Sequence, residues 1–434
     1  MVRRVTLLTA ALAASALVLT ACGGGSAAPA SSAPATGSAP SANAVPATTI
    51  GMQVEGVEVE AWPSAPFGAL RLWDNGTAWS QIETTKGEYK WDNLDGAIAN
   101  ASSKGMKDIL MVLGTTPEWA ASKKTKPFYP FDPKDPTRPN GANSAPKDMK
   151  DWDNWVTAVV TRYKGQITSY EIWNEASLKM FFNGKPEQMA EMTKRAYDII
   201  KANDPNALVV AASPSLRTQA SFDAFYPAYL KALAAAGWPV DVFSFHAYPP
   251  GDGTPADRAK LIEYFKKALT DAGAPADKQI WDTELNFGLK GPGETPKTDI
   301  TGAAAAGWIV RAYIDSLRAG IARSYWYIWT QKPYPLLGIQ AYPGSDGEQG
   351  FFALENWVIG SDFGGCQDAS GVVTCTFTRD GQQSIVAWSE AGDTQFTVPA
   401  GAQLVCDPLA NCQEATEGSQ ITLTETPVRL YLQA

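Results

Sequence analysis

Two short stretches of the sequence place carboxylates directly after apolar, strand-like runs. The first is SYEIWNEAS, residues 169–177, in which Asn174 and Glu175 stand side by side, and the second is QIWDTELNFG, in which Glu284 closes the run. Burying an unpaired carboxylate is costly, so strands that end in this way are expected to open onto a cavity where the acid has a chemical role. Two carboxylates facing one cavity can supply a proton donor and a nucleophile or general base.

The elements that must position these acids can be read from the spacing of apolar residues. Between about residues 50 and 330, short apolar runs rich in β-branched or aromatic residues alternate with segments of helical period. This alternation predicts an α/β fold with a parallel sheet, and eight strands fit a closed (β/α)8 TIM barrel. The predicted strands are Ile50–Gly56, Ala69–Trp73, Ile109–Gly114, Thr168–Asn174, Leu208–Ser213, Val240–His246, Gln279–Glu284 and Ser324–Trp329.

In such a barrel the catalytic groups gather at the carboxyl ends of the strands. Besides the two glutamates and Asn174, the predicted strand ends carry side chains that suit substrate binding: Arg71, Trp73, His246, Tyr248 and Trp329. Trp119, which follows the third strand, is a further candidate, and the alternative for all three tryptophans is packing in the core. Two carboxylates across a cleft are the machinery of glycoside hydrolysis, in which one protonates the departing oxygen while the other attacks or activates water.

These motifs resemble those of clan A glycoside hydrolases, a retaining (β/α)8 superfamily. EIWNEAS is similar to the acid/base motif and QIWDTELNFG to the nucleophile motif, and SQIETTKGEYKWDNLD, MVLGTTPEWA and DVFSFHAYP extend the similarity over about residues 51–329. The C-terminal segment resembles the β-sandwich of family 39 and its relatives. The chain is therefore identified as a family 39-like member of the clan.

The resemblance implies a role for each matching residue. Glu175 is the expected proton donor and Glu284 the expected nucleophile, which Arg71 keeps ionised and Tyr248 orients. Asn174 is expected to bind the sugar hydroxyl beside the reacting carbon, while His246 and Trp329 line the sugar subsite. Because side chains supply both the proton and the nucleophile, no metal or organic cofactor is expected.

The N-terminus contains the parts of a bacterial export signal. Arg3 and Arg4 precede an apolar stretch, and the ending LTAC resembles a lipoprotein box in which Cys22 becomes the lipidated first residue. The alternative is an ordinary secretory signal with an incidental cysteine. We therefore expect a signal peptide over residues 1–22 and a disordered Ala/Ser/Pro-rich tether over 23–49. The protein would then be exported and lipid-anchored on the extracytoplasmic face of the cell membrane.

Four further cysteines lie near the C-terminus, where the sequence pattern changes. Their short spacings suggest the bridges Cys366–Cys375 and Cys406–Cys412, although other pairings and an intracellular metal site are alternatives. Alternating residues around the turn at Asp380 predict antiparallel hairpins. The expected domains are a catalytic barrel over residues 50–350 and a small β-sandwich over 351–434.

Composition excludes several classes of protein. The net charge is −9, and no Lys/Arg cluster follows the extreme N-terminus, which disfavours a nucleic-acid partner. The single histidine, His246, leaves few zinc sites, and the chain lacks the Gly-x-Ser-x-Gly elbow of a serine esterase. The expected protein is a monomeric retaining glycosidase acting on a cell-surface or environmental polysaccharide. The alternative is a carbohydrate-binding lipoprotein that has kept the barrel without turnover.

Overall fold

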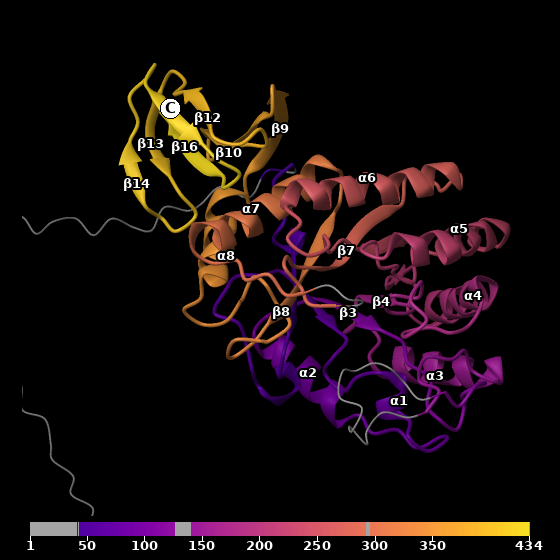
Figure 1. The fold of residues 1–434 in the computed structure, drawn as a ribbon. Helices are drawn as coiled ribbons and strands as arrows, with labels where there is room; N and C mark the ends of the chain where they lie inside the picture. Colours follow the sequence, from indigo (N-terminus) through magenta and orange to yellow (C-terminus); the bar gives the residue numbers. More distant parts are fainter. Residues whose placement is uncertain (1–40, 42, 126–139, 292–295, 434) are drawn as a thin grey trace, which may run out of the picture. The chain divides into compact units, whose positions relative to one another are not determined.

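The computed structural model describes residues 41, 43–125, 140–291 and 296–433 (Figure 1). The chain divides into two units, residues 1–39 and 40–434, and all the described residues belong to the second. The expected signal peptide, Cys22 and most of the expected tether therefore lie outside the described residues. Across the described ranges, none of the helices combines the length and apolar character needed to cross a membrane.

Eight parallel strands form a closed barrel in sequence order, with the first strand paired to the eighth (Figure 1). This confirms the predicted TIM barrel, and each predicted strand contains one of the observed strands or overlaps it. The observed strands are β1 (Ile50–Val54), β2 (Ala69–Leu72), β3 (Asp108–Val112), β4 (Ser169–Glu171), β5 (Leu208–Val210), β6 (Val242–His246), β7 (Gln279–Leu285) and β8 (Arg323–Trp329).

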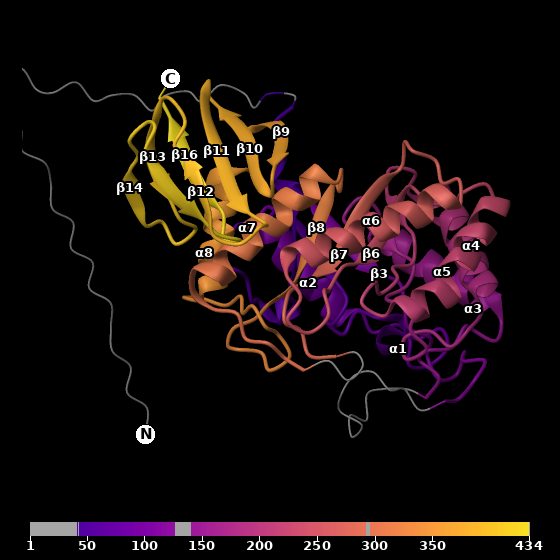
Figure 2. The same cartoon turned by 45° about the horizontal axis from the view of Figure 1, so that its top comes forward.

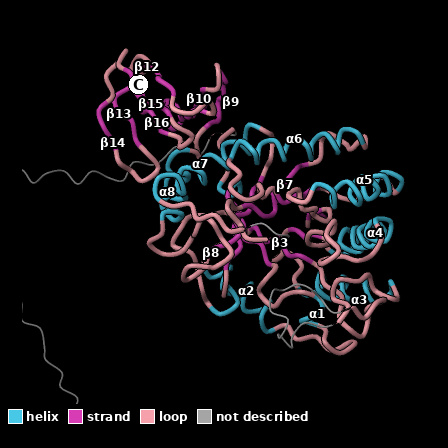
Figure 3. The backbone as a smooth tube through the Cα atoms, viewed as in Figure 1, coloured by secondary structure: helices cyan, strands magenta, loops and turns pink. Residues whose placement is uncertain are grey.

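Helices lie around the strands, as the backbone trace in Figure 3 shows. In the third of them, Trp152, Trp155 and Val159 are buried at helical spacing, and Asp148 caps the first turn by accepting from the Lys150 N–H. The connection from β1 to β2 holds only the short 3-10 turn η2 (Val57–Val59). The helices are α1 (Trp79–Ile82), α2 (Asp92–Ser103), α3 (Met149–Arg162), α4 (Pro186–Asn203), α5 (Gln219–Ala235), α6 (Pro255–Asp271), α7 (Gly302–Arg318) and α8 (Asp346–Trp357).

The interior of the barrel is apolar at one level and polar at the next. A buried cluster of Ala69, Leu110, Val210, Val242, Trp281 and Tyr325 fills the barrel. Gly51 is required here, because a Cβ would come within 2.3 Å of the Tyr325 ring. Two residues after Ala69 along β2, and therefore on the same face, stands Arg71, which begins the polar layer nearer the carboxyl ends of the strands. The apolar cluster thus forms a floor beneath the polar groups.

The C-terminal residues form an antiparallel six-stranded sheet, of order β14-β13-β16-β11-β10-β9, and a two-stranded sheet, β12-β15 (Figure 2). This confirms the predicted C-terminal β-domain, and both suggested disulfides form. Cys366–Cys375 links β9 to β10 and Cys406–Cys412 links β13 to β14. The strands are β9 (Asp362–Ala369), β10 (Val372–Arg379), β11 (Gln382–Ser389), β12 (Thr394–Thr397), β13 (Ala402–Cys406), β14 (Cys412–Glu414), β15 (Gln420–Leu423) and β16 (Val428–Leu432).

Two domain boundaries differ from the expected ones. The β-domain begins near Asp362 rather than at residue 351, because Phe351 belongs to α8 and packs edge-on against Trp326 of the barrel. Folded structure also extends to described residues that precede residue 50. Val45 is buried, and its backbone pairs with Ser361 and Gly360 at 2.9 Å and 2.8 Å. Apolar burial and backbone pairing therefore hold Val45 in the folded structure, whereas the sequence predicts a disordered tether there.

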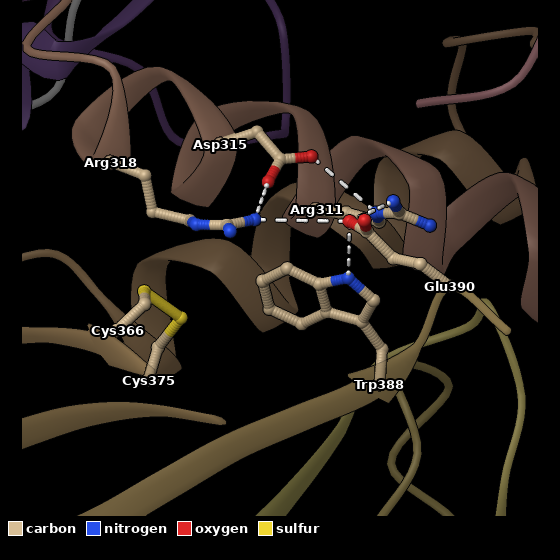
Figure 4. The surroundings of a disulfide bond; sticks show 7 residues. All are labelled: Arg311, Asp315, Arg318, Cys366, Cys375, Trp388 and Glu390. Carbon is tan, nitrogen blue, oxygen red and sulfur yellow. Dashed lines mark hydrogen bonds and ion pairs between the residues drawn. A yellow bond between two sulfur atoms is a disulfide. The ribbon is translucent and has the colours of Figure 1, made fainter. Parts of the chain in front are cut away.

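The β-domain contacts the barrel through helix α7 (Figure 4). Arg311 of α7 pairs with Glu390 at 2.6 Å, and its guanidinium lies over the ring of Trp388 at 5.4 Å. Arg318 lies over the same ring at 5.6 Å and pairs with Asp315 at 2.9 Å. Charge pairing and cation–π contact thus join α7 to the end of β11.

Candidate active site

The polar layer of the barrel is organised by one arginine. Arg71 donates from Nε to Glu171 Oε2 at 2.8 Å, from Nη1 to Glu284 Oε1 at 2.5 Å and from Nη2 to Asn174 Oδ1 at 2.8 Å. Although burial alone would lower the pKa of Arg71, the carboxylates of Glu171 and Glu284 raise it above its ordinary value. The arginine therefore stays charged and ties together strand ends β2, β4 and β7.

Glu171 is a third carboxylate, and it faces the barrel interior. Besides Arg71, its contacts are the hydroxyls of Thr283 at 3.0 Å and Ser244 at 3.3 Å. It is fully buried and does not line the cavity described below. This position suits a structural role, because Glu171 is held by its neighbours and does not face the cavity.

Glu284 lies among groups that favour its ionised form. Tyr248 Oη donates to Glu284 Oε2 at 2.9 Å, and His246 Nδ1 lies 3.4 Å from the same oxygen. Burial is the largest single influence and raises the pKa of Glu284, but the charges of His246 and Arg71 and the two hydrogen bonds together lower it below its ordinary value. Glu284 is therefore a carboxylate under ordinary conditions.

His246 lies between the two glutamates. Its Nδ1 is 3.3 Å from Glu175 Oε1 and 3.4 Å from Glu284 Oε2. Burial would lower the pKa of His246, yet Glu284 and Glu175 raise it above its ordinary value. Because both contacts are made to one nitrogen, at 3.3 Å and 3.4 Å, the two carboxylate oxygens lie at most about 6.7 Å apart. The two acids identified in the sequence therefore lie close together, with His246 between them.

The backbone at Glu175 has an uncommon conformation. Its φ is 43°, in the left-handed region that side chains other than glycine rarely adopt. The turn is held by the Glu175 N–H, which donates to Ser213 Oγ at 3.3 Å, and by the Ala176 N–H, which donates to the Ser213 carbonyl at 2.8 Å. Such residues cost about 1–3 kcal/mol and cluster at functional sites. The strained turn directs the Glu175 side chain into the same space as Glu284.

A small cavity, of about 50 Å³, opens to solvent at this end of the barrel. Five of the residues predicted from the sequence line it: Trp73, Asn174, Glu175, Tyr248 and Glu284. Arg71 and His246 lie beneath it as fully buried supports. The other lining residues are Met180, Phe181, Leu289, Lys290, Gly291, Tyr327 and Leu336.

Two tryptophans proposed as substrate-binding residues do not line the cavity. Trp329 is fully buried in the main hydrophobic core. Trp119 packs edge-on against Trp79, and its Nε1 donates to the Glu83 carbonyl at 2.7 Å. The aromatic residue that β8 contributes is instead Tyr327, two positions before Trp329. Strict alternation along β8 puts both on one face, so the sequence pattern could not separate them.

The residues that sequence reasoning missed lie mostly on connecting segments. Met180 and Phe181 follow β4, Leu289 to Gly291 follow β7, and Leu336 follows β8. Such segments carry no periodic signal that would place a side chain in a cleft.

Among the residues that the structure describes, no group of three or more His, Cys, Asp or Glu side chains is arranged to hold a metal ion.

Comparison with known proteins agrees with this geometry. The family model of cellulase (glycosyl hydrolase family 5) matches residues 66–332, a span that holds both Glu175 and Glu284. No curated protein sequence matches the chain.

Solved structures with a similar fold include three glycoside hydrolases. A family 39 glycoside hydrolase from the gut symbiont Bacteroides cellulosilyticus WH2 is 17% identical with a TM-score of 0.65, over 89% of this chain and 81% of that one. A monomeric beta-xylosidase from Caulobacter crescentus CB15 is 16% identical with a TM-score of 0.63, over 91% and 98%. A GH30 endoxylanase from Clostridium papyrosolvens C71 is 15% identical with a TM-score of 0.57, over 88% and 95%.

At these identities the similarity to solved structures, the family 39 enzyme among them, shows a shared fold. The match over more than half of the chain is to the family 5 model. The clan A resemblance inferred from the sequence motifs is confirmed. The chain belongs to the cellulase family, glycosyl hydrolase family 5, and is a glycoside hydrolase.

Proposed function

We propose that the protein cleaves O-glycosidic bonds of a polysaccharide by retaining double displacement, with Glu175 as proton donor and Glu284 as nucleophile. The supporting observation is the shared contact of both carboxylates with His246. Retaining enzymes hold their carboxyl groups about 5–5.5 Å apart, whereas inverting enzymes need about 6.5–9.5 Å to admit water. The upper limit of about 6.7 Å between these two oxygens admits the retaining separation and overlaps only the lower edge of the inverting range.

The division of roles follows from the unequal surroundings of the two acids. Glu284 has Arg71 and Tyr248 as hydrogen-bond donors, and its pKa is lowered, as a nucleophile requires. Within the described ranges, the Glu175 carboxylate has no hydrogen bond or salt bridge to an arginine or lysine. Two acids whose environments differ in this way suit one charged and one protonated role.

In the first step, Glu175 gives its proton to the departing oxygen while Glu284 attacks the anomeric carbon and forms a glycosyl ester. In the second, Glu175 takes a proton from water, and the water oxygen displaces Glu284. Asn174 supports both steps. Its Oδ1 accepts from Arg71 at 2.8 Å, so the Nδ2 end of the amide is the part that can donate to a sugar hydroxyl.

A screen of aryl glycosides and purified polysaccharides tests this proposal, with Glu175→Gln, Glu284→Gln and, as a control outside the cavity, Glu118→Gln. We expect each active-site variant to lose about 10²–10⁴-fold in kcat, since each removes a group that acts in the transition state. The Glu175→Gln loss should shrink with aryl leaving groups that need little protonation. Trapping with a 2-fluoro glycoside should label Glu284, and NMR should show retained configuration. Full activity in either active-site variant would refute the assignment.

We further propose that the protein is exported and lipid-anchored through Cys22, and that it acts as a monomer on a cell-surface or environmental polysaccharide. The two disulfides suit an oxidising exterior. Metabolic labelling with a fatty acid should mark the unsubstituted protein in cell membranes but not a Cys22→Ala variant. Light scattering of a form that lacks residues 1–22 measures the mass in solution, and a dimer mass would contradict the monomer.

A further inference from the structure

Lys290 is the one basic side chain among the residues that line the cavity in the described part of the chain. The other lining residues are apolar, aromatic or amide side chains, one glycine and the two glutamates. Lys290 is solvent-exposed. Over the described ranges its ammonium group has neither a hydrogen bond nor an ion pair, whereas many of the exposed lysines on the helices pair with a nearby carboxylate, as Lys194 does with Asp198. Among the described residues, the charge of Lys290 thus has no partner.

The backbone around Lys290 is held firmly from two sides. Its own N–H donates to the Leu336 carbonyl at 2.9 Å. The carbonyls of the residues before and after it, Leu289 and Gly291, accept from Nη2 and Nη1 of a single guanidinium, that of Arg217. Three hydrogen bonds therefore fix the main chain on both sides of the lysine.

Arg217 holds this segment although its own charge is partly buried and lacks an ionic partner among the described residues. It lies between β5 and α5, and no described carboxylate forms a salt bridge with it. Burial lowers the pKa of Arg217 below its ordinary value, which marks a guanidinium that is poorly compensated by charge. A half-buried cation that donates to two backbone carbonyls indicates that the position of the segment between them matters.

We propose that Lys290 recognises an anionic group, a uronate carboxylate or a sulfate ester, on the saccharide bound in the cavity, and that Arg217 is its positioning residue. This inference rests on the proposed polysaccharide substrate. The two glutamates give the cavity a negative field that repels an anionic sugar, and a lysine ammonium at the cavity wall offsets it locally. A neutral sugar needs only hydrogen-bonding groups, for which a free cation is not required.

Binding to the Glu284→Gln form, in which turnover is blocked, tests the inference by calorimetry. The ligands are matched sets: cello-oligosaccharides with their C6-oxidised and sulfated forms, and xylo-oligosaccharides with and without glucuronate branches. We expect Lys290→Met to weaken binding of an anionic member about five- to tenfold more than its neutral partner. The difference should shrink with added salt, and Lys290→Arg should restore it. Lys104→Met, which replaces an exposed lysine outside the cavity, should change the affinity for neither the anionic ligand nor its neutral partner.

The carboxylated and sulfated ligands distinguish the two sources of negative charge. If no anionic saccharide binds more tightly to the lysine form than to the methionine form, the inference is overturned. Hydrolysis of a neutral substrate by the unsubstituted protein, lost in the Glu284→Gln variant, would still uphold the proposed function in that case. The two proposals therefore fail separately.

Arg217→Met separates positioning from a general structural role. If Arg217 acts through Lys290, the variant should lose the preference for the anionic member while its affinity for the neutral partner stays within about twofold. Equal weakening of both ligands would show that Arg217 supports the whole cavity instead. It would then remove Arg217 from the inference.

Discussion

Replacing Tyr248 with phenylalanine should remove one hydrogen bond from the proposed nucleophile and little else. Tyr248 Oη donates to Glu284 Oε2 at 2.9 Å, and the ring belongs to a buried hydrophobic cluster with Leu289, Ile328 and Leu337, a place that phenylalanine can keep. A hydrogen bond to a charged group contributes about 1.5–3 kcal/mol, and one pKa unit corresponds to about 1.4 kcal/mol. Loss of this bond should therefore raise the pKa of Glu284 by about one to two units.

The sign of the effect on activity follows from the role of Glu284. The carboxylate must be ionised to attack, and its pKa in the folded protein lies below the ordinary value of 4.5. Activity should persist above that pKa and be lost as the pH falls through it. In the Tyr248→Phe variant the loss should begin at a pH about one to two units higher.

The pH dependence of kcat/KM on an aryl glycoside measures this shift, because it reports ionisation in the free enzyme. Tyr327→Phe is the matched control. Tyr327 also lines the cavity, but its hydroxyl donates to Asp74 at 3.0 Å rather than to a glutamate of the site. In Tyr327→Phe, the pH at which kcat/KM falls on the acid side of the profile (the acid limb) should be the same as in the unsubstituted enzyme. If the acid limb of Tyr248→Phe coincides with that of the unsubstituted enzyme, the account of how Glu284 is kept ionised is wrong.

Three further predictions concern stability, each measured by denaturant unfolding. Arg71→Met should lower the free energy of unfolding by about 3–5 kcal/mol, because it leaves Glu171 buried without its ionic partner, and a loss below about 1 kcal/mol would contradict this. Trp329→Ala should cost about 3–5 kcal/mol by opening a core cavity, while KM in the folded enzyme should stay unchanged; a raised KM would place Trp329 in the substrate site. Replacing Cys366 and Cys375 together with alanine should cost about 2–3 kcal/mol, and activity should be retained; complete loss of activity would show that the β-domain supports the barrel directly.

Much of the barrel could be predicted because its signals are local. Apolar runs and helical spacing repeat along the chain, and the strand ends at Glu175 and Glu284 could be found without knowing how the strands pair. The short spacing within each cysteine pair likewise favoured the two bridges that form. These features depend on residues close together in sequence.

The domain boundaries could not be predicted as well, because they depend on which side chains become buried in the folded protein. Helical spacing does not say whether Phe351 packs on the barrel or on the following sheet. A valine in an Ala/Ser/Pro-rich stretch gives no sign that it is buried, yet Val45 pairs with Ser361. These contacts join segments far apart in the sequence.

The sequence by itself determined the fold class and identified Glu175 and Glu284 as the pair of acids, since strand periodicity and residue type can be read from short stretches of sequence. Only the tertiary structure decided which side chains meet those acids. Arg71 reaches Glu171 and Glu284 because barrel closure brings distant strand ends together, and Tyr327 rather than Trp329 enters the cavity. Likewise, Arg217 reaches the carbonyls of Leu289 and Gly291, on either side of Lys290, only because two separate connecting segments lie together. Local pattern does not encode such contacts, because they depend on strand register and on the paths of the connecting segments.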